Sequence, residues 1–177
     1  MQKLRLAAAA AAAALAVSSG AGAQELRIGF LNTTTGGGAL IGKHLMNGWV
    51  LGLEHQGWTK DGDKIGGVPT KIFYADDQAK PDVGLKEVDK FLKQDKVHIV
   101  AGIIWSHVMM TIQKPIFEAK AMILSTNAGP SPLAGELCNP LFTSSSFMND
   151  GMNTARFPIS DRSTGRTSSA VSALMSS

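Results

Sequence analysis

Three segments of the sequence carry residue types that could bind a small anion. Residues 32–38 (NTTTGGG), 105–107 (WSH) and 126–130 (TNAGP) place Gly, Ser, Thr and Asn directly after short apolar runs. Such segments offer hydroxyl groups and free backbone N–H groups, and the N-terminus of a following helix adds a partial positive charge. This combination suits a carboxylate, for which Ser106 supplies a hydroxyl in the second segment.

The same segments lack the patterns expected of a nucleotide site or a hydrolase. The glycine run at 36–38 does not end as a phosphate-binding loop, because Gly42 and Lys43 are followed by His44 instead of Ser or Thr. Ser106 and His107 are neighbours in the sequence, whereas a catalytic Ser and His must face each other in space. We therefore expect no nucleotide binding and no Ser–His catalysis here.

The acidic, histidine and cysteine residues also form no pattern typical of catalysis or of a metal site. Asp76 and Asp77 follow a predicted strand and are interpreted as solvated loop charges. The four histidines form no i, i+4 pair, and the single cysteine, Cys138, excludes both a CxxC motif and a disulfide within the chain. The sequence thus predicts no enzyme activity, no cofactor and no metal.

Apolar periodicity predicts the elements that must position these segments. Strands are expected at residues 26–31, 70–75, 97–104, 121–125 and 141–144, and helices at 39–56, from 81 onward and at 108–119. The expected apolar helix faces are Ile41, Leu45, Trp49 and Leu53, then Leu85, Val88 and Leu92. This alternation predicts an α/β fold with a doubly wound parallel sheet, in which ligands bind at the carboxyl ends of the strands.

The ends of the sequence differ in composition from its middle. Residues 1–23 combine a short basic start, an unbroken Leu/Ala/Val run at 6–17 and a small-x-small ending, so we expect a signal peptide cleaved near Ala23. Residues 24–150 form the predicted domain. Residues 151–177 are rich in Ser, Thr and Arg without periodicity, and we interpret them as an appended tail, either disordered or the product of a frameshift.

Charge and hydropathy exclude two further classes of protein. The formal net charge is +3, and no basic stripe with interleaved aromatic residues is present, which argues against a nucleic-acid partner. The apolar run at 6–17 is too short to span a bilayer, so the mature chain is not expected to be embedded in a membrane. Export through the signal peptide predicts localisation in the periplasm.

Several motifs, in this order and spacing, resemble a known family. They are LRIGFLN with its Gly-rich loop, IGKHLMNGW, YADDQAKPDVGLKEVDKFLKQDKVHIVAGIIWS and PIFEAKAMILSTNAGPSPLAGELCNPLFTSSSFMND. Together they resemble the type 1 periplasmic binding proteins, in the Leu/Ile/Val-binding group that serves ABC transporters. The resemblance covers about residues 25–150 and implies the first lobe of a two-lobe protein, with a flavodoxin-like strand order.

The resemblance also implies which residues bind the ligand. In this family the first lobe holds a carboxylate through a Ser after the third strand and through backbone groups and a Thr hydroxyl after the fourth. Ser106 matches that Ser, while Gly129 falls where amino-acid binders have the Thr. Trp105 adds an aromatic ring beside the pocket, which would suit an aromatic acid. The full set of matching positions is Ile41, Trp105, Ser106, Asn127, Ala128 and Gly129.

We therefore expect the extracytoplasmic substrate-binding component of an ABC transporter, present as a truncated copy. Its ligand would be a branched-chain amino acid or a related small carboxylate, aromatic ones included, and its protein partner the transporter permease. A sensor or receptor domain on the same fold and an enzyme on a flavodoxin-like fold remain as alternatives.

Overall fold

The computed structural model describes residues 25–146, 148 and 149, and the expected signal peptide and tail lie outside these residues. Within them a six-stranded sheet has the order β2-β3-β1-β4-β5-β6. The strands are β1 (Leu26–Asn32), β2 (Lys64–Ile65), β3 (Val68–Asp76), β4 (Ile99–Gly102), β5 (Met122–Ser125) and β6 (Phe142–Ser144).

Five of the strands run parallel, and their order confirms the predicted topology. β1 pairs with β3 and β4, β4 pairs with β5, and β5 pairs with β6, all in parallel. Counted along the chain, the parallel strands lie in the order second, first, third, fourth, fifth, which is the flavodoxin-like order. The short β2 was missed by periodicity, because a two-residue strand shows none; it pairs antiparallel with β3 across a Gly66-Gly67 turn.

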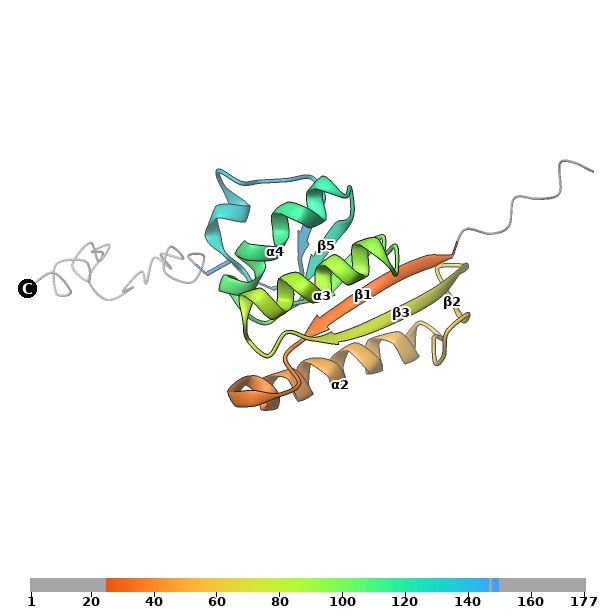
Figure 1. Ribbon diagram of the computed structural model, residues 1–177. Helices are drawn as coiled ribbons and strands as arrows, with labels where there is room; N and C mark the ends of the chain where they lie inside the picture. The colour runs from red at the N-terminus through yellow and green to blue at the C-terminus, as the bar shows by residue number, and fades with distance from the viewer. Residues whose placement is uncertain (1–24, 147, 150–177) are drawn as a thin grey trace, which may run out of the picture.

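Helices cover both faces of the sheet, as expected of a doubly wound fold. α3 (Pro81–Lys93) and α4 (Ser106–Glu118) lie on one face, and α2 (Ala39–His55) lies on the other, against the end of the sheet formed by β1 and β3 (Figure 1). Two short 3-10 helices, η1 (Gly36–Gly38) and η2 (Ser131–Ala134), complete the elements of the described residues.

Alternate residues of β1 divide the core into two clusters. Leu31 packs with Val88 and Phe91 of α3 on one face, while Ile28 and Phe30 pack with α2 on the other. A strand with both faces buried explains the apolar run at the start of the domain. Helices therefore pack on both faces of β1, the strand that leads into the first predicted site loop at residues 32–38.

The buried face of α3 differs from the predicted one. Gly84, Val88 and Phe91 are buried, whereas Leu85 is 40% exposed, so the prediction for Leu85 was wrong. Gly84 lies so close to α4 that an added Cβ would come within 2.8 Å of a Val108 methyl group. Close approach of two helices at a glycine turns the neighbouring leucine outward, an effect that apolar periodicity does not register.

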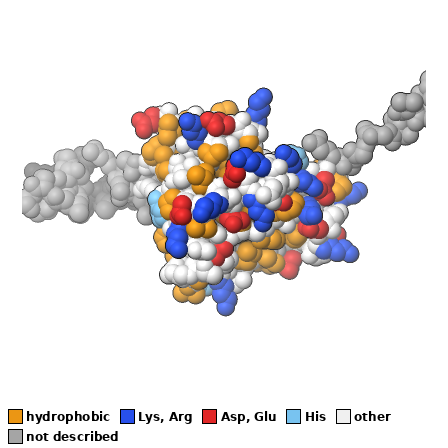
Figure 2. Space-filling view, in the orientation of Figure 1, with side chains coloured by type: hydrophobic (Ala, Val, Ile, Leu, Met, Phe, Trp, Pro, Cys, Tyr) orange, Lys and Arg blue, Asp and Glu red, His pale blue; other side chains and the backbone are white. Residues whose placement is uncertain are grey.

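Charged side chains of both signs are interspersed over the face shown in Figure 2. Among the described residues, no helix is both long enough and apolar enough to cross a membrane.

Candidate functional site

The carboxyl ends of the parallel strands meet at one edge of the sheet. The register aligns Leu31 with Gly102, Gly102 with Ser125, and Ser125 with Ser144. The loops that follow β1, β4 and β5 are therefore neighbours, as the sequence predicted for residues 32–38, 105–107 and 126–130. This edge is the candidate functional site.

The chain leaves β4 through two residues in the left-handed region of backbone conformation. Gly102 has φ +94° and Ile103 has φ +68°, a value that β-branched residues rarely adopt. Hydrogen bonds hold Ile103 there: its N–H donates to Leu31 O (2.8 Å), and its carbonyl accepts from the N–H of Ala128 (3.0 Å). This bend ends β4 earlier than predicted and directs residues 104–106 toward the edge of the sheet.

The N-terminus of α4 presents donors to this edge. The N–H of Met109 donates to Trp105 O (3.0 Å), so the N–H groups of residues 106–108 precede the helical hydrogen-bond ladder. Ser106 is the first helical residue, and Trp105 occupies the N-cap position without a side-chain cap.

The hydroxyl of Ser106 keeps its proton available. Its oxygen accepts a hydrogen bond from the side-chain amide of Asn149 (3.0 Å). The backbone N–H of Asn149 also donates to Gly129 O (2.6 Å). Asn149 thus links the second site loop to the third, and the Ser106 proton is left to donate to an anion.

The loop after β5 is held against β4 by its own polar groups. The Asn127 side chain donates to Ile104 O (2.8 Å), and the Thr126 hydroxyl donates to Gly102 O (3.1 Å). Ala128 is 1% exposed; its N–H bonds to Ile103 and its carbonyl accepts from the Ser125 hydroxyl. Asn127 itself remains exposed, next to the buried Gly129.

Ile41 lies in the first turn of α2, which directly follows the first site loop. Its side chain is 46% exposed, although the sequence placed it on the apolar face with Leu45, Trp49 and Leu53. Of those residues Leu53 is buried, and Leu45 and Trp49 are partly buried. The described residues thus bring Trp105, Ser106, Asn127 and Gly129 to one edge and leave Ile41 on an open helix surface.

Asp77 is buried and Asp76 is partly exposed, and both accept hydrogen bonds from the first site loop, which corrects the interpretation of the pair as solvated loop charges. Asp77 is fully buried, and its Oδ1 accepts from the Thr33 hydroxyl (2.5 Å) and the N–H of Ala79 (2.9 Å). The Thr33 oxygen in turn accepts from the indole N–H of Trp105 (3.0 Å). Sequence reasoning missed Asn149 at this edge, and it did not predict the hydrogen bonds of Thr33 and Asp77.

Asp76 fastens the Gly-rich loop from the other side. Its carboxylate accepts from the N–H of Thr34 (2.9 Å), the hydroxyl of Thr35 (2.6 Å) and the N–H of Gln78 (2.9 Å). Partial burial raises the pKa of Asp76, but the hydrogen bonds from Thr35, Thr34 and Gln78 outweigh it and hold the pKa at about 2.

This depressed pKa predicts how stability depends on pH. Because the folded-state pKa lies below the ordinary value of 3.8, the Asp76 contribution is complete above pH 3.8 and is lost as the pH falls through about 2. Above pH 3.8 we expect Asp76→Asn to unfold at a lower urea concentration than the parent. Below a pH of about 2 the two proteins should be equally stable. Urea unfolding followed by circular dichroism across this range tests the prediction.

Thr35→Val removes one hydrogen-bond donor to Asp76. Its stability to urea should lie between that of the parent and that of Asp76→Asn. A stability difference between the parent and Asp76→Asn that stays constant with pH would contradict the assigned role.

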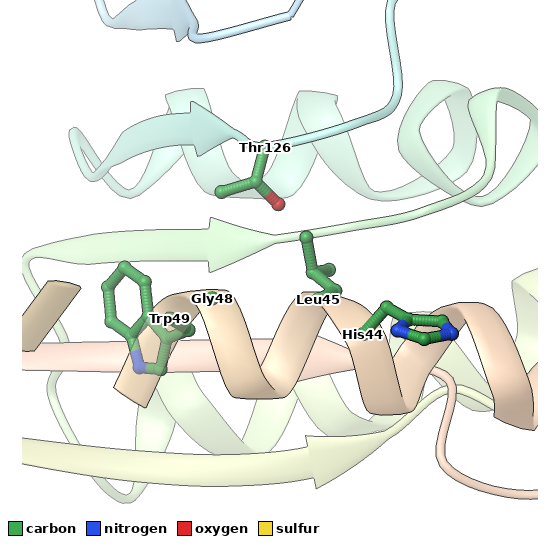
Figure 3. Close-up of a pocket in the computed structure, with 5 residues that line it drawn as sticks. All are labelled: His44, Leu45, Gly48, Trp49 and Thr126. Atoms are coloured by element: carbon green, nitrogen blue, oxygen red, sulfur yellow. The ribbon is translucent and has the colours of Figure 1, made fainter. Parts of the chain in front are cut away.

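A shallow hollow of about 260 Å³ lies on the α2 side of the same edge, lined by His44, Leu45, Gly48, Trp49 and Thr126. Figure 3 shows Thr126, after β5, facing the four α2 residues across it. The predicted site residues 105–107 do not line this hollow.

Comparisons with known proteins agree with this architecture. A family model described as periplasmic binding protein matches residues 25–160. An ABC transporter substrate-binding protein from Sphaerobacter thermophilus is 26% identical with a TM-score of 0.64, and the match covers 71% of this chain and 33% of that protein. A solute-binding protein of an ABC transporter from R. palustris, solved with benzoate, is also 26% identical, with a TM-score of 0.65 and coverage of 72% and 34%.

A leucine-binding protein from Thermotoga maritima shares the fold at 13% identity, with a TM-score of 0.63 and coverage of 71% and 34%. The chain therefore spans about a third of the length of these solved structures. A sequence comparison with curated proteins found no match.

Proposed function

The chain belongs to the periplasmic binding protein family, and on that premise we propose that it binds a small carboxylate as the solute-binding part of an ABC transporter. Its place of action is the periplasm, after removal of a signal peptide near Ala23, and its protein partner is the transporter permease. The relatives of at least 25% identity support this proposal, because they are substrate-binding or solute-binding proteins of ABC transporters.

The observation that carries the proposal is the set of donors at the start of α4. The N–H groups of residues 106–108 precede the helical ladder, and the Ser106 hydroxyl, oriented by Asn149, has a proton to donate. Helix N-termini stabilise anions through these N–H groups and the helix dipole. The loop after β5 lies beside them, so a carboxylate would be bound between the two.

The ligand class that we propose is an aromatic carboxylate. Trp105 offers an indole ring beside the carboxylate donors, and the third loop has Gly129 where amino-acid binders of this family carry a hydroxyl. The R. palustris relatives that were solved with benzoate and with 4-hydroxybenzoate are 26% and 25% identical to this chain. The leucine-binding structure, at 13% identity, supports the fold alone.

A titration of the isotope-labelled 177-residue chain with benzoate, followed by backbone NMR, tests this function. We expect amide shifts at Ser106 and at residues 127–129, with a dissociation constant of about 1 mM or weaker, because one lobe contacts only part of a ligand. Leucine should give smaller shifts at the same residues.

The control variants lie on the same helix. Ser106→Ala should weaken benzoate binding by about tenfold, which is the lower end of the range for a hydrogen bond to a charged group. Thr111→Ala, on an exposed position of α4, should leave it unchanged. Shifts that avoid residues 105–107 and 126–130, or a Ser106→Ala variant that binds as the parent does, would contradict the proposed site.

A further inference from the structure

Three side chains from three different strand-end loops form one hydrogen-bonded chain. Trp105, after β4, donates its indole N–H to the Thr33 hydroxyl oxygen at 3.0 Å. Thr33, after β1, donates its hydroxyl proton to Oδ1 of Asp77, after β3, at 2.5 Å. The sequence separations are 72 and 44 residues, so this chain exists only because the parallel sheet brings the three loops together.

The direction of these hydrogen bonds is determined by the chemistry of the groups. An indole nitrogen only donates, and a threonine hydroxyl has a single proton. Since Thr33 gives that proton to Asp77, its oxygen is free to accept from Trp105. Asp77 is fully buried, and its Oδ1 also accepts a hydrogen bond from the N–H of Ala79 at 2.9 Å, so the acceptor at the end of the chain is held by a second bond.

The indole of Trp105 is held on its other side by the Gly-rich loop. A Cβ added to Gly38 would lie 2.9 Å from Cζ2 of Trp105 and 3.0 Å from the Thr33 methyl group. The ring is only partly buried, and its centroid lies 6.1 Å from that of His107 in the first turn of α4. The indole therefore stands between the loop and the helix N-terminus, with one part of its surface open.

We propose that Thr33 is a positioning residue for Trp105, with Asp77 behind it, and that the fixed indole sets a preference for flat aromatic carboxylates. Aromatic rings attract each other most in defined edge-to-face or offset geometries, so an indole held in one orientation favours a ring over an aliphatic group of similar size. This inference rests on the proposed function, because it assumes a carboxylate beside Ser106.

The first test reads the indole directly and needs no ligand. In ¹H–¹⁵N spectra of the 177-residue chain, the Trp105 indole resonance is assigned by its disappearance in Trp105→Phe. Thr33→Val keeps the shape of the side chain but removes the hydroxyl, and should move this resonance upfield and speed its exchange with water. Thr33→Ser should restore the parent behaviour.

The matched control is Thr111→Val in α4, the helix that begins directly after Trp105. This substitution removes a hydroxyl that donates to His107 O (3.1 Å). It should leave the Trp105 indole resonance in place. The positioning role of Thr33 is overturned if the Trp105 indole resonance does not change in Thr33→Val, or if it moves by the same amount in Thr111→Val.

The second test compares benzoate with cyclohexanecarboxylate, which has the same carboxylate on a saturated ring. The parent should prefer benzoate, and Thr33→Val should reduce that preference about fivefold, while Thr33→Ser retains it. An unchanged preference in Thr33→Val overturns the selectivity role although the proposed function stands. Failure of the parent to bind either acid overturns the proposed function and the selectivity role together, but the indole result stands by itself.

Discussion

Replacing Gly102 with alanine is expected to lower the free energy of unfolding by about 3 kcal/mol, from a strained backbone and a steric clash together. Gly102 has φ +94°, which disfavours any side chain. A Cβ at this position would also lie 2.3 Å from Leu31 O in the neighbouring strand. Relief of the clash would push β1 away from β4 at the edge where Ile103 turns the chain toward Trp105 and Ser106. Urea unfolding followed by circular dichroism measures the loss.

Gly57→Ala separates the two contributions to that loss. Gly57 has φ +79°, but nothing lies within 4 Å of an added Cβ, so only the backbone term applies. We expect it to cost about 1 kcal/mol. If Gly102→Ala and Gly57→Ala destabilised the protein equally, the close approach of β1 and β4 at Gly102 would not matter, and our account of this edge would be wrong.

Gly42→Ala is expected to lower the free energy of unfolding as much as Gly102→Ala does, but through a steric clash alone. An added Cβ would lie 1.7 Å from Thr33 O, which is shorter than any non-bonded contact, so either α2 or the first site loop must move. Overpacking of this kind costs typically 1–3 kcal/mol, and we expect about 3 kcal/mol here because the obstacle is backbone. The melting temperature and the urea midpoint should both fall.

The same substitution should disturb the proposed ligand site. Displacement of Thr33 breaks its hydrogen bonds to Asp77 and Trp105, so the indole resonance of Trp105 should shift in Gly42→Ala. Gly52→Ala, in the same helix, is the matched control, since nothing lies within 4 Å of its added Cβ. It should stabilise the protein by about 0.5–1 kcal/mol, because alanine favours helix more than glycine does. If Gly52→Ala lowered the stability as much as Gly42→Ala does, the contact with Thr33 would not be the cause of the loss in Gly42→Ala.

Local patterns in the sequence determined the elements and their order. The alternation in residues 26–31 and the apolar run at residues 97–104 predicted strands, and the alternation of strands with helices predicted a parallel sheet. That topology placed the ends of β1, β4 and β5 at one edge, and so it also predicted which loops meet there. These features depend on residue spacings of two to four, which a single sequence displays directly.

Tertiary structure alone decided how the residues of that edge act on one another. The sequence showed two adjacent acidic residues, but only the packing of the loops buried Asp77 against Thr33 and left Asp76 to fasten Thr34 and Thr35. The Asn149–Ser106 and Trp105–Thr33 hydrogen bonds join residues 43 and 72 positions apart. The physical reason is that hydrogen bonds and burial depend on distances in space, and pairs this far apart acquire theirs only when the parallel register aligns the strand ends.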